Sequence, residues 1–350
     1  MMASVVLNGA RSSARSSAAS RARIQEAAAR LGYRRNAAAV GLARRKMDTL
    51  GVVTVIDGGD INLYFHEVLN GILEAASEHR QNTTLFSIRD WNKDDHRILD
   101  CCDGRIDGMI LVSPLLTPEF AAVLPTHTPC VTIHSSRPVQ NTHNLDIDNY
   151  AAAYDITRYL IDCGHRDILH ISGGHYSGAN ERAQGFLSAL KDARLPSEDS
   201  RVIPGTFTAA AGREIMTDLL RRRPSAPLPS AIFCGNDAIA LGCMEVLSLR
   251  SVRVPEVISV VGFDDTLMAR MTHPALTTVR QPLRSMGRRA VEILLEAQNE
   301  PIAVGETAPL DAGPASHNRA GQAINEILPV ELVIRQSVRI VTDSDSGTRY

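Results

Sequence analysis

Three polar side chains lie after apolar segments or at the start of a helix, in positions where they could hold a ligand. Asp264 ends the segment VISVVGF, and a carboxylate there can accept hydrogen bonds from ligand hydroxyls. Arg182 opens RAQGF at the expected start of a helix, and its planar guanidinium can clamp two ligand oxygens. Asn236 follows the apolar run at 230–233, and its amide could contact a ligand or cap the next helix.

Signals for catalysis or metal binding are weak in this sequence. It contains no GxSxG nucleophile elbow and no HExxH zinc motif, and SGGHYSG at 172–178 lacks the Lys-Ser/Thr pair of a phosphate-binding loop. The spacing of the histidines near Cys130 fits no zinc site; they are His127, His134 and His143. We therefore predict a protein that is not an enzyme and has no catalytic residues, no metal and no cofactor.

The elements that would position these side chains alternate along the chain from residue 50 onward. Helical patterns such as 64–79, 150–163 and 237–250 separate short β-branched runs, and this alternation is typical of doubly wound α/β sheets with parallel strands. Ligands bind such sheets outside the carboxyl ends of the strands. Two runs divided near Asp148 predict two lobes with a cleft between them. The expected strands are 50–56, 83–88, 109–113, 129–134, 167–171, 230–233 and 257–261.

The charge is distributed unevenly along the chain. Residues 1–48 carry ten Arg and Lys against two acids, a net charge of +8. The net charge of the whole chain is −2, so residues 49–350 carry a net charge of −10. This asymmetry indicates contact with nucleic acid or another anionic surface at one end. The Ser- and Arg-rich start alone could also be a transit peptide. The helical spacing of RIQEAAARLGY, with Gly32 as a stop, favours a DNA-binding headpiece.

Several segments, in this order, resemble the LacI/GalR family of bacterial transcription regulators: SVVLNG, ARLGY, NAAAVGLARRK, RIDGMILVS, LDIDNYAAAYDITRYLIDCGHRDILHISG, VPEVISVVGFDD and HPALTTVRQPLRSMGRRAVEILLE. The resemblance covers nearly the whole length. It implies an α/β fold of two doubly wound, Rossmann-like lobes, similar to periplasmic binding proteins, preceded by a small all-α headpiece with a partial helix-turn-helix. It also implies a transcriptional repressor that binds double-stranded operator DNA and is controlled by a small effector held between the lobes.

The resemblance also implies DNA contacts in the headpiece and hinge. In the family, a hinge leucine wedges into the minor groove of the operator, and Leu42 falls at that position. Gly41 beside it costs a helix about 1 kcal/mol relative to alanine. The first helix and the front of the recognition helix would precede Ser4, so we expect a truncated headpiece, from a late start or a degraded gene. The expected DNA-binding residues are Ser4, Asn8, Arg34, Asn36, Ala39 and Leu42.

The expected truncation of the headpiece leaves an alternative function open: a sugar-sensing core that has lost specific operator binding. The resemblance also implies aromatic residues that line the cleft. Of Tyr64 and Phe65, one should face the ligand while the other packs in the core. The arginine, aspartate and asparagine among aromatic faces suit a monosaccharide or glycoside, with a purine nucleoside or base as the weaker option. The expected effector-binding residues are Tyr64, Phe65, Arg182, Phe207, Asn236 and Asp264.

The predicted organisation has a headpiece with hinge helix and an effector-binding core of two lobes. The segment at 299–326 is Gly- and Pro-rich and longer than the family's connection, so we expect an exposed loop there. The predicted bounds are 1–48 for the headpiece and hinge and 49–350 for the core, with about 49–147 and 279–325 in the first lobe and about 148–278 and 326–341 in the second.

The expected setting and partners follow from composition and from the resemblance. The six cysteines form no CxxC pair, which favours reduced thiols and a cytoplasmic location. No apolar run approaches the roughly 18 residues of a membrane-spanning helix. We expect a homodimer, because one headpiece would contact only half of an operator.

Overall fold

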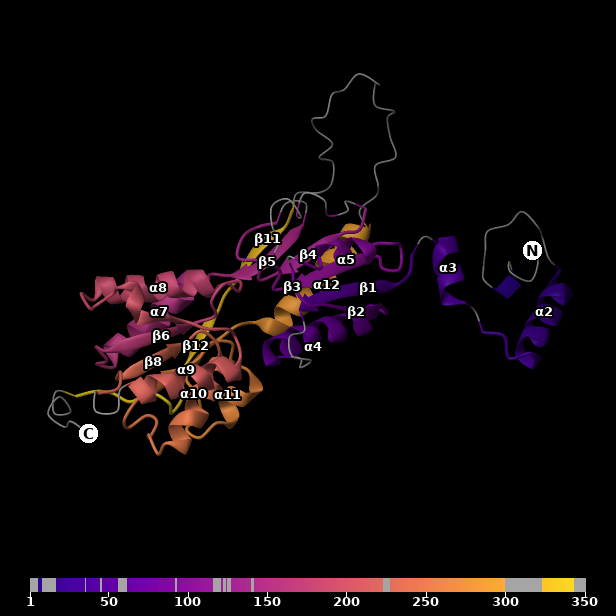
Figure 1. Ribbon diagram of the computed structural model, residues 1–350. Helices are drawn as coiled ribbons and strands as arrows, with labels where there is room; N and C mark the ends of the chain where they lie inside the picture. Colours follow the sequence, from indigo (N-terminus) through magenta and orange to yellow (C-terminus); the bar gives the residue numbers. More distant parts are fainter. Residues whose placement is uncertain are drawn as a thin grey trace, which may run out of the picture.

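The described part of the chain forms two α/β lobes and a separate pair of N-terminal helices, shown in Figure 1. The computed structural model describes residues 6–7, 17–34, 36–44, 46–55, 62–91, 93–115, 121, 124, 127–139, 142–222, 227–299 and 323–342. Ser4, Asn8 and most of the segment 299–326 lie outside the described residues. Among the described residues, no helix is long and apolar enough to cross a membrane.

Parallel strands form the six-stranded sheet of the first lobe, in the order β11-β5-β4-β3-β1-β2. The predicted strands at 50–56, 83–88, 109–113 and 129–134 are confirmed. Strands β5 and β11 were not predicted, because their residues HNLDI and NEIL are too polar to stand out as buried strands. The bounds are β1 (Thr49–Val55), β2 (Asn82–Ile88), β3 (Gly108–Val112), β4 (Cys130–Ile133), β5 (His143–Ile147) and β11 (Asn325–Leu328).

The second lobe contains a four-stranded parallel sheet in the order β7-β6-β8-β9. The predicted strands at 167–171, 230–233 and 257–261 are confirmed, while the short β7 was missed. A separate antiparallel pair, β10 and β12, continues from the second sheet, since isolated parallel bridges join Val261 to Thr277 and Asp264 to Arg280. The bounds are β6 (Ile168–Ser172), β7 (Val202–Pro204), β8 (Ala231–Cys234), β9 (Ser259–Val261), β10 (Thr278–Arg280) and β12 (Glu331–Val333).

Helices cover both faces of each sheet, as the alternating pattern predicts. The first sheet packs α4 and α12 on one face and α5 on the other, and the second packs α7 and α8 opposite α9 and α10. The bounds are α4 (Leu63–Glu78), α5 (Asp95–Asp100), α7 (Asn149–Asp162), α8 (Ala179–Asp192), η1 (Asp199–Arg201), α9 (Ala209–Arg222), α10 (Asp237–Leu249), α11 (Leu267–Met271) and α12 (Leu283–Asn299).

Glycines let the helices of each pair approach closely. A Cβ added at Gly71 of α4 would lie 2.0 Å from the Arg284 carbonyl oxygen of α12. The corresponding distance is also 2.0 Å between Gly242 of α10 and the Ala209 carbonyl oxygen of α9. A side chain at either position would overlap the neighbouring helix, so glycine at these two positions allows the close spacing of the paired helices.

The chain passes between the lobes near residues 148, 280 and 330. Asp148 caps α7 by accepting a hydrogen bond from the Ala151 N–H at 2.8 Å. Strand β11 pairs with β5 up to Leu328, so the sheet of the first lobe extends slightly beyond the predicted boundary near residue 325.

The N-terminal helices α2 (Ala18–Arg30) and α3 (Ala37–Arg44) extend away from the lobes in Figure 1. Ser17 caps α2 by accepting a hydrogen bond from the Ser20 N–H at 3.1 Å. Gly32 follows its last turn with a φ of 62°, the left-handed conformation that ends many helices. The predicted helix and its glycine stop are therefore confirmed.

Candidate functional site

A cavity of about 170 Å³ is lined by side chains from both lobes. The first lobe contributes α4 and the end of β4, and the second contributes α8 and the loops after β8 and β9. The carboxyl ends of these strands meet at the cavity, as expected for doubly wound sheets. Six of its lining residues are those that the sequence analysis selects: Tyr64, Phe65, Arg182, Phe207, Asn236 and Asp264.

Arg182 of α8 is held in place by groups of its own lobe. Its Nε donates to Asn149 Oδ1 at 2.8 Å, and its Nη1 donates to the Gly235 carbonyl at 2.6 Å. The side chain is 5 % exposed, and burial lowers its pKa although the nearby acid Asp264 opposes this. These contacts fix the orientation of the guanidinium plane. A guanidinium can donate two parallel hydrogen bonds to ligand oxygens.

Asp264 follows β9 and is 4 % exposed. Its Oδ1 accepts a hydrogen bond from Gln281 Nε2 at 2.6 Å. Burial, with the neighbouring Asp237, raises the pKa of this carboxyl to about 8. Near pH 7 the group is therefore mostly protonated, and a neutral carboxylic acid can both donate and accept hydrogen bonds.

Tyr64 and Phe65 occupy different surroundings at the start of α4. Phe65 is 3 % exposed and belongs to the main hydrophobic core, although it also contributes to the cavity wall. The Tyr64 hydroxyl forms a hydrogen bond with His134 Nδ1. This agrees with the expectation that one aromatic of the pair packs in the core.

His134 is a cavity residue that the sequence analysis missed. It follows β4, is 5 % exposed, and burial lowers the pKa of its ring to about 3, so the imidazole is neutral. Its Nε2 has no hydrogen-bond partner among the described residues. Its position just after an apolar strand could have identified it, because Asp264 and Asn236 also lie just after apolar strands.

Asn236 resolves one of the alternatives left open by the sequence. Its Oδ1 accepts a hydrogen bond from the Ile239 N–H at 2.9 Å, so it caps α10, and it also lines the cavity. Its Nδ2 donates to the Phe207 carbonyl at 3.4 Å. The Phe207 ring covers Gly173, where an added Cβ would lie 2.2 Å from the ring. An apolar ring face thus borders the polar groups.

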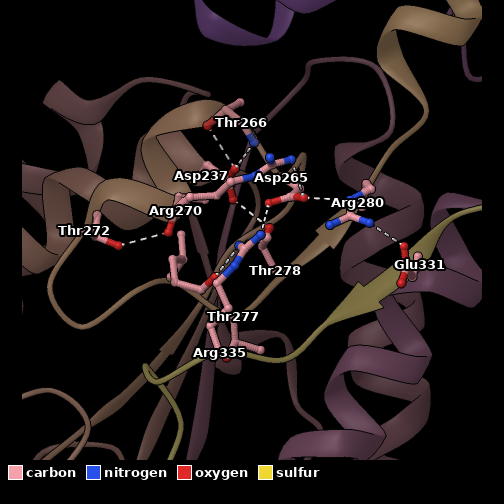
Figure 2. A network of polar contacts seen from close by, with 12 residues as sticks. Asp237, Asp265, Thr266, Arg270, Thr272, Thr277, Thr278, Arg280, Glu331 and Arg335 are labelled. Atoms are coloured by element: carbon pink, nitrogen blue, oxygen red, sulfur yellow. Dashed lines mark hydrogen bonds and ion pairs between the residues drawn. The ribbon is translucent and has the colours of Figure 1, made fainter.

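A polar network around Asp265, the residue after Asp264, reaches the cavity residue Thr266 and the strands β10 and β12 (Figure 2). Asp265 has no exposed side-chain surface and accepts hydrogen bonds from Arg280 Nε at 2.7 Å and Arg335 Nη2 at 2.5 Å. Arg280 also pairs with Glu331 at 2.6 Å, which joins β10 to β12. Burial alone would raise the pKa of Asp265, but the arginines hold it below its usual value. This network was not predicted.

The expected DNA-binding residues that the structure describes lie on and before α3. Leu42 is 81 % exposed, and Arg34 and Ala39 are also exposed. Asn36 caps the helix, since its Oδ1 accepts a hydrogen bond from the Ala39 N–H at 3.2 Å. An exposed leucine on a short helix outside the lobes is available for contact with another molecule.

Comparison with known proteins agrees with this architecture. Residues 157–338 match the periplasmic binding protein-like domain family. The chain is 33 % identical over 285 residues to catabolite control protein A of Priestia megaterium, covering 80 % of this chain and 84 % of that protein. It is also 33 % identical over 294 residues to the HTH-type transcriptional repressor PurR of Vibrio parahaemolyticus, covering 79 % and 83 %.

Solved structures show the same fold. The transcriptional regulator CelR in complex with cellobiose has a TM-score of 0.68 at 28 % identity, over 95 % of this chain and 94 % of that chain. The lac repressor dimer bound to operator and an anti-inducer has a TM-score of 0.75 at 22 % identity, over 96 % and 94 %. The fold and the cavity define an effector-domain protein of the periplasmic-binding-protein-like class. Within it, the chain belongs to the LacI/GalR family of transcriptional repressors.

Proposed function

We propose that this repressor binds a neutral sugar in the cavity between the lobes and operator DNA through its headpiece and hinge helix, as a homodimer. The effector would be held by the core, 49–350, and the operator by residues 1–48. The observation that carries the proposal is the convergence of Arg182, Asp264 and Asn236 in one cavity with aromatic walls.

The charge state of the cavity supports a neutral, hydroxylated ligand. His134 is neutral, Asp264 is mostly protonated near pH 7, and the Arg182 cation already makes two hydrogen bonds to the protein. Hydroxyl groups can donate and accept, so they match a site whose acid and imidazole do both. One relative, CelR, was solved with cellobiose. A purine base, the weaker option, would instead present flat ring faces to Phe207.

Calorimetric titration with glucose, ribose and cellobiose, and with adenine and hypoxanthine, tests the effector. We expect binding of at least one sugar that is weakened about tenfold or more by Asp264→Asn, because a protein hydrogen bond to ligand is lost or mispaired. Asp218→Asn, on α9 and outside the cavity lining, is the matched control. Binding of purines only would overturn the sugar assignment.

Binding to a palindromic operator-like duplex and a scrambled duplex, over a range of salt, tests the DNA function. Phosphate contacts alone give similar affinities that fall steeply with salt, because counterion release does not depend on sequence. We expect a preference of about a hundredfold or more for the palindrome. Equal affinity would support the alternative, a sugar-sensing core without specific operator binding. Sedimentation analysis of the same sample tests the homodimer.

A further inference from the structure

The linker between the hinge helix α3 and strand β1 is held by one carboxylate. The Met47 N–H donates to both oxygens of Asp107, at 2.8 Å to Oδ1 and 2.9 Å to Oδ2. The Thr49 N–H is 3.4 Å from Asp107 Oδ2. One linker amide and the first amide of β1 therefore converge on a partly buried acid from another part of the first lobe, and hydrogen bonds to a charged acceptor are stronger than neutral ones.

Asp107 itself is fixed to the body of the lobe through its backbone. Its N–H donates to the Thr49 carbonyl at 2.8 Å, and its carbonyl accepts a hydrogen bond from Gln298 Nε2 at 3.3 Å. Gln298 lies near the end of α12, the helix that follows the crossover strand β10. Asp107 thus joins the linker to β1 and to α12, which packs along α4 beside the cavity.

Gly41 gives a second, independent contact between α3 and the linker. A Cβ added at Gly41 would lie 2.3 Å from Met47 Sδ and 3.2 Å from the Lys46 carbonyl oxygen. The glycine therefore lets α3 rest directly on the Met47 side chain, while the next residue, Leu42, is 81 % exposed. This close approach accounts for a glycine inside a helix of eight residues.

We propose that Asp107 is a positioning residue that fixes the hinge helix α3 on the first lobe, so that movements of this lobe are transmitted to Leu42. The carboxylate binds the linker backbone at Met47, and Met47 supports α3 at Gly41. The consequence for DNA rests on the proposed function, whereas the anchoring contacts do not depend on it.

Hydrogen exchange of the full-length chain, followed by mass spectrometry, tests the anchor. We expect Asp107→Asn to exchange at least tenfold faster than wild type over 37–49, with unchanged rates in α4. Asp103→Asn is the matched control, since Asp103 is exposed, pairs with Arg105 and carries the same charge. Unchanged exchange over 37–49, or equal acceleration in α4, would overturn the proposal.

Gly41→Ala provides a variant that leaves Asp107 in place. We expect the same local acceleration over 37–49, because the added methyl group meets Met47. Wild-type exchange in this variant would contradict the docking of α3 on Met47 and, with it, the route from Asp107 to Leu42.

Duplex binding tests the functional consequence. Both aspartate variants remove one negative charge, so they change the long-range attraction to DNA similarly. We expect Asp107→Asn to bind the palindrome at least fivefold more weakly than Asp103→Asn at the same salt concentration. Equal affinity would refute transmission through Asp107. If wild type fails to prefer the palindrome, the proposed operator function fails, and the exchange rates still decide whether Asp107 anchors the linker.

Discussion

The guanidinium carbon of Arg182 lies 3.7 Å from the centre of the Phe263 ring, and Phe263 directly precedes Asp264. The cation and the acid of the cavity are therefore supported by the same short segment after β9. A buried cation over an aromatic face is stabilised by about 2 kcal/mol. Arg182 thus keeps its orientation without a ligand, which lowers the entropy that binding must offset.

Replacing Arg182 with lysine should weaken effector binding although it keeps the charge. An ammonium cannot reproduce the two fixed bonds to Asn149 and Gly235 or the planar contact with Phe263. We expect about 10- to 100-fold weaker binding of the sugar that binds wild type, measured by calorimetry. Arg158→Lys, at an exposed ion pair on α7, should change affinity less than about twofold. Equal affinities of the two variants would refute this role of Arg182.

The raised pKa of Asp264 predicts lower stability at higher pH. The folded protein holds this proton up to about pH 8, whereas an unfolded aspartate loses it near pH 4, so the free energy of unfolding falls as pH rises between these values. Between pH 6.5 and 8 the loss should be at most about 2 kcal/mol. Urea unfolding should show this loss in wild type and a flatter profile in Asp264→Asn. Parallel profiles would mean that Asp264 is ionised in the folded protein.

Asp265→Asn should destabilise the protein strongly. The carboxylate has no exposed side-chain surface and accepts hydrogen bonds from Arg270, Arg280 and Arg335. Removing the charge of this buried carboxylate should cost about 3 kcal/mol, because Arg335, whose side chain is only 13 % exposed, loses its charged partner. Glu331→Gln, whose carboxylate is 65 % exposed, should cost less than about 1 kcal/mol. Urea unfolding at pH 7 measures the free energy of unfolding of both variants. Comparable losses would show that Asp265 contributes no more to stability than the exposed Glu331.

His170 predicts a loss of stability in acid. Its ring stacks on Phe233, Nδ1 donates to the Phe233 carbonyl at 2.9 Å, and burial lowers its pKa to about 4. An unfolded histidine binds its proton near pH 6.5, so the free energy of unfolding falls as pH drops from 6.5 towards 4. Between pH 6.5 and 5 this group contributes at most about 2 kcal/mol. His170→Phe should show a smaller decrease over this range, whereas an unchanged decrease would show that His170 is not its source.

Much of the fold could be predicted because buried parallel strands leave a clear pattern. Runs such as GMILV at 108–112 are apolar on both faces and separated by helical patterns. Strands β5 and β11 lack this pattern, since they pair with each other beside β4 through a polar surface that includes Asn144 and Asn325. Their place in the sheet depends on pairing partners far apart in the sequence.

The sequence by itself determined the two-lobe α/β architecture, the family and the side chains that follow the strands, since these depend on local periodicity and on residue type. Only the tertiary structure decided that His134 joins Tyr64, that Asp265 gathers three arginines and that Asp107 holds the linker. These contacts join residues that lie far apart in the chain or in separate elements, and burial changes their protonation. Neither the distances nor the local dielectric can be read from residue spacing.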